Sequence, residues 1–426
     1  MKASGIAVQT GVISAMLCLA FGVASPIVRA ETAEVLPKGI FNVDGDIYFY
    51  KDITKRYDPD GDEELLGADY NATLDSTVFP ALQPLDAFVP GNAAVGDSVV
   101  DFKFDYTTAE LDFRYGLTND VSIGIKFPYF DAKNRVNATL DTSTANVGKN
   151  PLYNPAGPFP LNSPVVPLGT GIGETPLTDE DVQELLGAGI DVNGDGMVDV
   201  PGFGYKRFET WDGKGLGDIE AGAKWKFYEA SPWRLALAGG VRLPTGEKDD
   251  PDDLTDLAFG DSQTDLLFRF YADYLGVERW TFNATLFVDI QLPDEEVRRV
   301  PVDVNEPITA NKEKVDRDLG DIIELDLMAL YSFAPGWSAY VQYRGSKKFK
   351  DDIDGSQGFN YKSLEDETDW TSHIGKFGLS YSTLQRYQEK KFPIPMYAGL
   401  EYRNRFAGSN NINKSEYIAL NVGVYF

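Results

Sequence analysis

Cysteine and histidine are almost missing from this chain, which has one of each among its 426 residues. Disulfide scaffolds need paired cysteines and zinc sites are built largely from cysteine and histidine, so both are nearly excluded. The single His373 follows Ser372 but lacks the serine two positions later that marks outer-membrane phospholipases. We therefore expect no enzymatic activity, and no cofactor apart from a calcium ion considered below.

Basic residues are also scarce. The chain has 39 Lys and Arg but 66 Asp and Glu, which gives a formal charge of −27. A nucleic-acid partner is thereby excluded, since binding to phosphates requires a basic surface. The mean hydropathy of −0.26 is too low for a protein that crosses a membrane with several helices of about 20 apolar residues each. Hydrophobic residues nevertheless make up 43% of the chain, so it is not disordered by composition.

The first 30 residues resemble a secretory signal peptide. Lys2 supplies the basic end, residues 11–24 form an apolar core, and Val28, Arg29 and Ala30 form a small-x-small cleavage site. The alternative is a transmembrane anchor, but Pro26 interrupts the apolar stretch and no stop-transfer cluster follows. We predict cleavage near Ala30 and a mature chain of residues 31–426 in the outer membrane of a Gram-negative cell.

Most of the remaining sequence alternates between apolar and polar residues with period two. Ile219, Ala221, Ala223, Trp225 and Phe227, for example, share one face of a predicted strand whose other face is mostly charged. Such alternation indicates a strand with one apolar and one polar face. We predict twelve strands, each about 10 to 14 residues long, which suits a tilted membrane-spanning strand. Their approximate bounds are 41–50, 107–116, 121–130, 217–228, 233–244, 262–274, 278–291, 319–332, 337–349, 373–384, 394–405 and 415–426.

The connections between these strands alternate in length. Short turns follow most of the even-numbered strands, whereas long connections follow the odd-numbered ones, the longest being about 51–106 and 131–216. An even number of strands with short turns at one end and long loops at the other is typical of outer-membrane barrels. The sequence therefore predicts an all-β fold: a transmembrane antiparallel β-barrel with short periplasmic turns and long extracellular loops.

Aromatic residues gather beside the predicted short turns, on the apolar faces of the strands. Their clustering at one end predicts an aromatic girdle at a membrane boundary. The chain ends on the aromatic Phe426, which resembles the C-terminal motif recognised by the barrel-assembly machinery. The girdle residues are Tyr115, Trp225, Trp233, Tyr274, Trp280, Tyr331, Phe333, Trp337 and Tyr381.

The predicted inward faces carry nearly equal numbers of acidic and basic residues, so the excess of acid lies mainly in the loops. We favour the interpretation that these inward charges pair with one another, and the alternative is a polar conduit lined by both signs. Twelve strands enclose a lumen whose width is intermediate between that of filled eight-stranded barrels and that of open porins. The predicted lumen-lining residues are Glu110, Asp112, Arg114, Lys126, Glu220, Lys224, Arg234, Arg242, Arg269, Asp289, Glu324, Asp326, Arg344 and Arg403.

The loops contain two dense acidic segments, 58–64 and 249–253. Such loops would collect divalent cations that bridge to lipopolysaccharide, in addition to the contacts of the barrel with outer-membrane lipid. The alternative, which we favour, is a solvated and self-repelling surface.

One loop segment has a sharper pattern. Asp191, Asn193, Asp195 and Asp199 occupy positions 1, 3, 5 and 9 of a segment with glycine at position 6, as in the first part of a calcium-binding loop. The bidentate glutamate expected at position 12 is missing. Residues 178–186 before it read as a short helix capped by Thr178. Calcium binding and a plain Asp/Asn/Gly turn both remain open.

Four short motifs resemble the outer-membrane family named for the meta-pathway of phenol degradation. They are Tyr115-Gly116-Leu117-Thr118, Ile125-Lys126-Phe127-Pro128-Tyr129, Gly215-Leu216-Gly217-Asp218-Ile219 and Leu243-Pro244-Thr245-Gly246. The resemblance implies a channel or transporter for small hydrophobic or aromatic molecules. The rival interpretation is a structural or adhesive surface barrel with a closed lumen and functional acidic loops.

Overall fold

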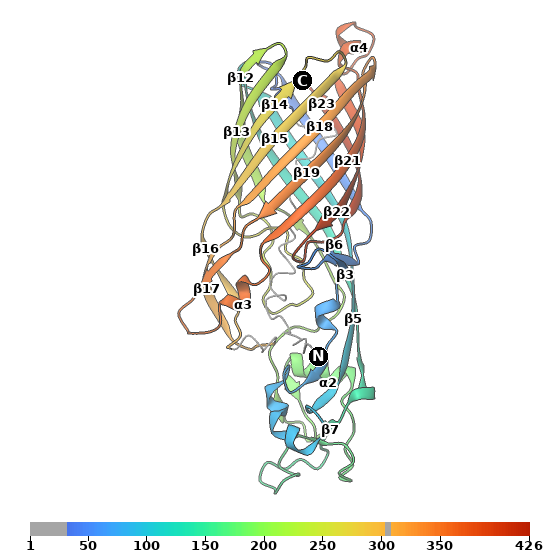
Figure 1. Cartoon of the computed structure of the whole chain (residues 1–426), viewed down its shortest axis with the longest axis vertical. Helices are drawn as coiled ribbons and strands as arrows, with labels where there is room; N and C mark the ends of the chain where they lie inside the picture. Colours follow the sequence, from blue (N-terminus) through green and yellow to red (C-terminus); the bar gives the residue numbers. More distant parts are fainter. Residues whose placement is uncertain (1–31, 303–307) are drawn as a thin grey trace.

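Twelve antiparallel strands form a closed barrel in the computed structural model, which describes residues 32–302 and 308–426 (Figure 1). The last strand pairs with the first, and this pairing closes the sheet. The predicted twelve-stranded transmembrane barrel is confirmed, whereas the predicted signal peptide lies outside the described residues. The barrel strands are β1 (Phe41–Tyr50), β5 (Ala94–Gly116), β6 (Val121–Asp141), β12 (Ile219–Ala230), β13 (Trp233–Leu243), β14 (Asp265–Tyr274), β15 (Trp280–Gln291), β18 (Ile322–Ala334), β19 (Trp337–Lys348), β21 (Trp370–Ser382), β22 (Met396–Gly408) and β23 (Glu416–Tyr425).

The outer face of the barrel carries exposed apolar residues, with aromatic rings at the end where the short turns lie. Rings on neighbouring strands pair there: the centroids of Trp280 and Tyr331 and those of Trp337 and Tyr381 are each 4.8 Å apart. Trp233 and Tyr274 form a third pair at 5.0 Å. Amphipathic rings are stable at the level of lipid headgroups, so this band marks the periplasmic boundary of the membrane.

Strands β5 and β6 are about twice as long as predicted, and they continue far beyond the barrel as a paired ribbon (Figure 1). Residues 94–106 and 131–141, which we expected to be loop, are therefore strand. The alternation inverts where the ribbon leaves the membrane. On β6 the outward residues change from Phe127 and Tyr129 to Asp131 and Lys133, because the outer face now meets water instead of lipid.

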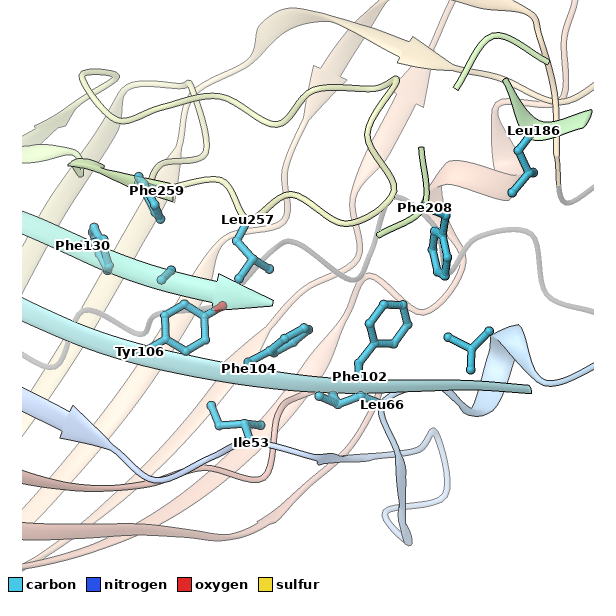
Figure 2. Close-up of a cluster of buried hydrophobic side chains, with 12 residues drawn as sticks. Ile53, Leu66, Phe102, Phe104, Tyr106, Phe130, Leu186, Phe208, Leu257 and Phe259 are labelled. Atoms are coloured by element: carbon cyan, nitrogen blue, oxygen red, sulfur yellow. The ribbon is translucent and has the colours of Figure 1, made fainter. Parts of the chain in front are cut away.

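The opposite face of this ribbon is apolar and is covered by other loops. Figure 2 shows Phe102, Phe104 and Tyr106 on one side of β5, facing Phe208 and Leu257 from two different loops. The rings of Phe130 on β6 and Phe259 are stacked, with centroids 5.3 Å apart. The long loops thus bury a hydrophobic core outside the membrane, which we call the extracellular region.

Short elements complete this region and the turns. Among the described residues, no helix is long and apolar enough to cross a bilayer. The elements are β2 (Lys55–Tyr57), β3 (Glu63–Leu65), η1 (Ala68–Tyr70), β4 (Thr73–Asp75), η2 (Pro80–Phe88), η3 (Thr142–Thr144), β7 (Val147–Lys149), β8 (Val165–Pro167), α2 (Asp179–Leu186), β9 (Gly189–Ile190), β10 (Val200–Pro201), β11 (Trp211–Leu216), β16 (Asp294–Arg299), β17 (Lys312–Asp318), β20 (Asp352–Asp354), α3 (Lys362–Glu365) and α4 (Leu384–Gln388).

The acidic segments 58–64 and 249–253 are paired with basic side chains. Arg298 and Asp249 lie 2.5 Å apart, and Arg299 and Asp252 lie 2.6 Å apart. In the other segment, the buried Arg56 contacts Glu64 at 2.7 Å. Our expectation of a solvated, self-repelling surface is therefore wrong for 249–253, because basic residues from other parts of the chain neutralise that segment. In 58–64, Glu63 and Glu64 have basic partners, whereas Asp60 and Asp62 are exposed to solvent as expected.

Asp256 lies next to the acidic segment 249–253 and is itself buried. One of its carboxylate oxygens accepts the backbone N–H of Asp250 at 2.9 Å. Burial, and after it the negative charge of Asp249, raises the pKa of Asp256 from its ordinary value of 3.8 to about 8. The folded loop therefore holds a proton here that the unfolded chain loses near pH 4. The stability that this proton contributes is complete below about pH 4 and is lost as the pH rises through about 8.

We expect the Asp256→Asn variant to protect the loop 245–261 from proteolysis at high pH. At about pH 4 the wild type and the variant should be cut at similar rates, and the wild type should be cut progressively faster than the variant as the pH rises to about 8. The ratio of the two rates cancels the protease's own pH dependence. A ratio that does not change with pH would contradict the assigned protonation.

Candidate functional site: the barrel lumen

The structure places all fourteen predicted lumen residues on the inner side of the barrel wall. Asp112, Arg114, Lys224 and Arg269 are half-buried, and the other ten are buried. Because lipid-facing residues alternate with them along each strand, their burial reflects the inside of the barrel and not a membrane contact.

One charge cluster of the lumen surrounds Arg242 on β13. Its guanidinium lies 2.5 Å from Asp265, 2.9 Å from Asp289 and 3.4 Å from Glu220. Glu220 also contacts Lys126 of β6 at 3.1 Å. One arginine thus compensates three carboxylates contributed by β12, β14 and β15. The cluster links these strands, and each buried charge has an opposite charge in contact with it, so removing one partner would leave the others uncompensated.

A second cluster lies further round the barrel wall, around Arg344 of β19. Arg344 donates two parallel hydrogen bonds to Asp326, at 2.7 and 2.6 Å. It also lies 3.6 Å from Glu324, which accepts a hydrogen bond from Ser346 at 2.7 Å. A planar guanidinium matches a carboxylate in this bidentate arrangement, so the pair is held in one orientation.

Aromatic rings lie between these clusters. The hydroxyls of Tyr340 and Tyr417 both donate hydrogen bonds to Glu401. Arg269 lies over the ring of Phe287 at 4.2 Å, and Arg403 lies over the ring of Tyr417 at 5.2 Å. The lumen wall therefore presents ring faces and neutralised charges.

The periplasmic mouth of the lumen holds a segment that our sequence analysis missed. Residues 32–38 run inside the barrel wall before β1 begins. The backbone N–H of Ala33 donates to Asp273 of β14 at 2.9 Å, and that of Leu36 donates to Ser122 of β6 at 2.7 Å. Glu34 forms an ion pair with Arg234 at 2.8 Å. We call residues 32–38 the mouth segment.

The mouth segment forms one wall of a cavity of about 240 Å³. Ala33 is completely buried against Tyr271 and Ala236, which shows how closely the segment packs. Lys224 extends across the ring of Tyr271 and donates a hydrogen bond to the carbonyl of Thr32. The remaining walls of the cavity include the predicted lumen residues Asp112, Arg114, Lys126, Glu220 and Arg269.

Ser372 and His373 do not form a catalytic pair. Ser372 is buried and accepts a hydrogen bond from Arg405 at 2.9 Å. His373, on the opposite face of β21, contacts the hydroxyl of Tyr343 at 2.7 Å. Successive residues of a strand point to opposite faces, so the two side chains cannot meet.

The segment 178–199 begins with the expected helix, because Thr178 caps α2 in a capping box with Asp181. The aspartates that follow accept backbone hydrogen bonds. Asp191 accepts the N–H groups of Gly194 and Gly196, each at 2.7 Å, and the bond from Gly196 above all holds the pKa of Asp191 below its ordinary value. Asp199 accepts the N–H of Val192 at 2.9 Å. Such bonds are typical of a turn that needs no metal.

Among the described residues, no group of three or more acidic, histidine or cysteine side chains is arranged to hold a metal ion. Calcium binding by Asp191, Asn193, Asp195 and Asp199 stays a prediction. If calcium binds, EGTA should increase protease cutting within about 178–205 and leave heat-modifiable migration of the barrel unchanged, because strand pairing lies in the membrane. Asp195→Ala should have the same effect as EGTA. Equal cutting with and without calcium would reduce the segment to a turn.

Residues 175–409 match the model of the protein family described as "Putative MetA-pathway of phenol degradation". The match covers more than half of the chain and extends from the segment before α2 to the end of β22. The chain belongs to this family. The resemblance inferred from the sequence motifs is thereby confirmed, although the two motifs near Tyr115 and Tyr129 lie outside the matched residues.

Solved structures support the fold of this family member. A crystal structure of an outer membrane channel from Pseudomonas putida F1 is 11% identical and has a TM-score of 0.51, with 92% of this chain and 98% of that chain covered. At this identity the likeness shows the fold alone. A Pseudomonas aeruginosa FadL homologue, 9% identical over 91% of this chain and 90% of that chain, has a TM-score of only 0.34, and we draw nothing from it. No curated protein matches the chain significantly.

Proposed function

We propose that this barrel is an outer-membrane channel for small uncharged molecules, chiefly apolar or aromatic ones. The observation that carries the proposal is the cavity of about 240 Å³ inside the barrel, beside the mouth segment. A cavity of roughly 150 Å³ is sufficient to bind benzene in an engineered protein. The lumen therefore has room for one aromatic ring.

The character of the lumen wall supports an uncharged solute. Arg242, Arg344 and Glu220 already contact opposite charges of the wall, so a charged solute would have to compete with these pairs. Tyr271, Tyr340 and Phe287 add buried aromatic rings to the lumen wall, so part of the wall is apolar.

A barrel with a permanently closed lumen is the second candidate. The mouth segment favours it, because Ala33, Glu34 and Leu36 are all held by wall residues. Whether the barrel is a channel or a closed barrel depends on whether these contacts break and the mouth segment moves aside. A segment held by a few hydrogen bonds and one ion pair, and not by strand pairing, is of the kind that opens locally without unfolding the barrel.

Conductance in planar bilayers tests the two candidates. The proposed channel should show discrete current steps from transient opening of the mouth segment, and vesicles containing it should release small uncharged solutes that phospholipid vesicles without the protein retain. A protein that shows neither current nor solute release would be a closed structural barrel.

A further inference from the structure

A second cavity, of about 140 Å³, lies outside the barrel in the extracellular region. It is enclosed by the ribbon of β5 and β6, by α2, and by the segment from η1 to η2. The exposed residues Asp69, Thr139 and Asp179 lie at its rim, so it opens to solvent. Its walls include Tyr70, Leu74, Val78, Phe79, Val100, Ala138, Leu140, Val182, Leu186 and Phe208.

Three polar side chains at this cavity, those of Asp69, Asp179 and Gln183, already have partners within the protein. Asp179 accepts the backbone N–H of Leu140 at 2.6 Å. The side-chain amide of Gln183 donates to the carbonyl of Phe208 at 3.0 Å and accepts the N–H of the same residue at 2.9 Å. Asp69 is bound to the buried Arg56. A polar or charged ligand would have to displace these bonds, whereas an apolar ligand leaves them intact.

Two aromatic rings of the wall, Tyr70 and Phe208, form a cluster with the neighbouring Phe102. The ring of Tyr70 meets that of Phe102 edge-on at 5.1 Å and that of Phe208 at 5.6 Å, and Phe102 and Phe208 are 5.7 Å apart. An added ring gains further edge and face contacts from such a cluster, each worth about 0.5–1.5 kcal/mol beyond burial of its area. The rings therefore favour an aromatic occupant over an aliphatic one.

We propose that this extracellular cavity is a binding site for one uncharged monocyclic aromatic molecule. Its volume is close to the roughly 150 Å³ of an engineered apolar cavity that stays dry and binds benzene. An empty apolar cavity of this size has unsatisfied packing contacts that such a ring would supply.

The apolar face between this site and the barrel indicates its role, which rests on the function proposed above. Phe102, Phe104 and Tyr106 follow one another along the covered face of β5, from the cavity wall toward the lumen (Figure 2). A ring bound in the cavity therefore lies at the outer end of a packed row of aromatic residues, where it would be concentrated from the surroundings before entry.

Binding is tested with fluorobenzene and the full mature chain in lipid nanodiscs. The fluorine NMR line of fluorobenzene should broaden beyond its width with empty nanodiscs. Val182→Phe fills the cavity from α2, and Ala138→Leu fills it from β6, so each should remove the part of the broadening that the cavity causes. Val198→Phe is the matched control, because Val198 is exposed on a loop outside the cavity. It should broaden the line like the wild type.

Heat-modifiable migration and protease resistance of the extracellular region identify variants that have folded. Equal broadening by the wild type and by folded Val182→Phe or Ala138→Leu would overturn the proposal. If the fluorine NMR line of the charged 4-fluorobenzoate is broadened by the wild type but not by the cavity variants, the assignment to uncharged rings is overturned. Loss of binding in both cavity variants would support the site even if the wild type transports nothing, so failure of this site and failure of the channel are separate results.

Discussion

Refolded protein that begins at Gly39, and so lacks the mouth segment, is expected to conduct ions several-fold better than protein that begins at Glu31. Removing the segment deletes a wall of the cavity at the periplasmic mouth, where Ala33 and Leu36 are hydrogen-bonded to the barrel. The strand pairing of β1 does not depend on these residues, so the barrel should still close. The measurement is single-channel conductance in planar bilayers.

Two controls accompany this experiment. Lys38→Ala changes an exposed side chain and should leave the conductance unchanged, because only the backbone of Lys38 contacts Asn119. Glu34→Gln weakens the ion pair with Arg234 and should lengthen the open times without enlarging the fully open current. Equal conductance of the two chain lengths would show that the mouth segment does not limit passage.

Arg242→Ala is expected to lower the free energy of unfolding by about 3–5 kcal/mol, the usual cost of removing one partner of a buried ion pair. The substitution leaves Asp265, Asp289 and Glu220 close together without their shared cation. The mutual repulsion of these three carboxylates and their loss of hydration are then uncompensated, which is costly for buried charges. Denaturant titration of the protein in lipid vesicles measures the change.

The matched control for this variant is Arg279→Ala. Arg279 lies at a periplasmic turn, its side chain is more than half exposed, and it contacts only the neighbouring Glu278, at 3.8 Å. An exposed pair of this kind contributes about 0–1 kcal/mol, so the control should unfold like the wild type. Similar losses in the two variants would mean that the cluster around Arg242 has no special role.

The sequence was sufficient to predict the twelve barrel strands, because every strand that faces lipid on one side and the lumen on the other must alternate. The same rule explains why the extensions of β5 and β6 were missed. Beyond Thr107 and Phe130 the apolar residues change from the outer face to the inner face, as Phe104 and Ala132 illustrate. A pattern that reverses its phase looks like the end of a strand unless the environment is known to change there.

The lumen residues follow from the same alternation, but their pairing does not. Arg242 and Asp289 are 47 positions apart, and which acids share Arg242 depends on the register of four neighbouring strands. The mouth segment had no sequence pattern that could reveal it. Its contacts come mainly from backbone N–H groups and one glutamate, and such groups occur in any short connecting segment.

Passage of small uncharged aromatic molecules through this barrel is measured most directly as uptake by whole cells. Intact cells are needed because the lipopolysaccharide layer, and not phospholipid, is the barrier to such solutes. Cells that lack the protein and cells that produce it are compared for the initial uptake of a radiolabelled alkylbenzene, with benzoate as the charged comparison. We predict faster uptake of the alkylbenzene, and unchanged uptake of benzoate, when the protein is present. Equal uptake of the alkylbenzene by both kinds of cell would contradict the proposed channel.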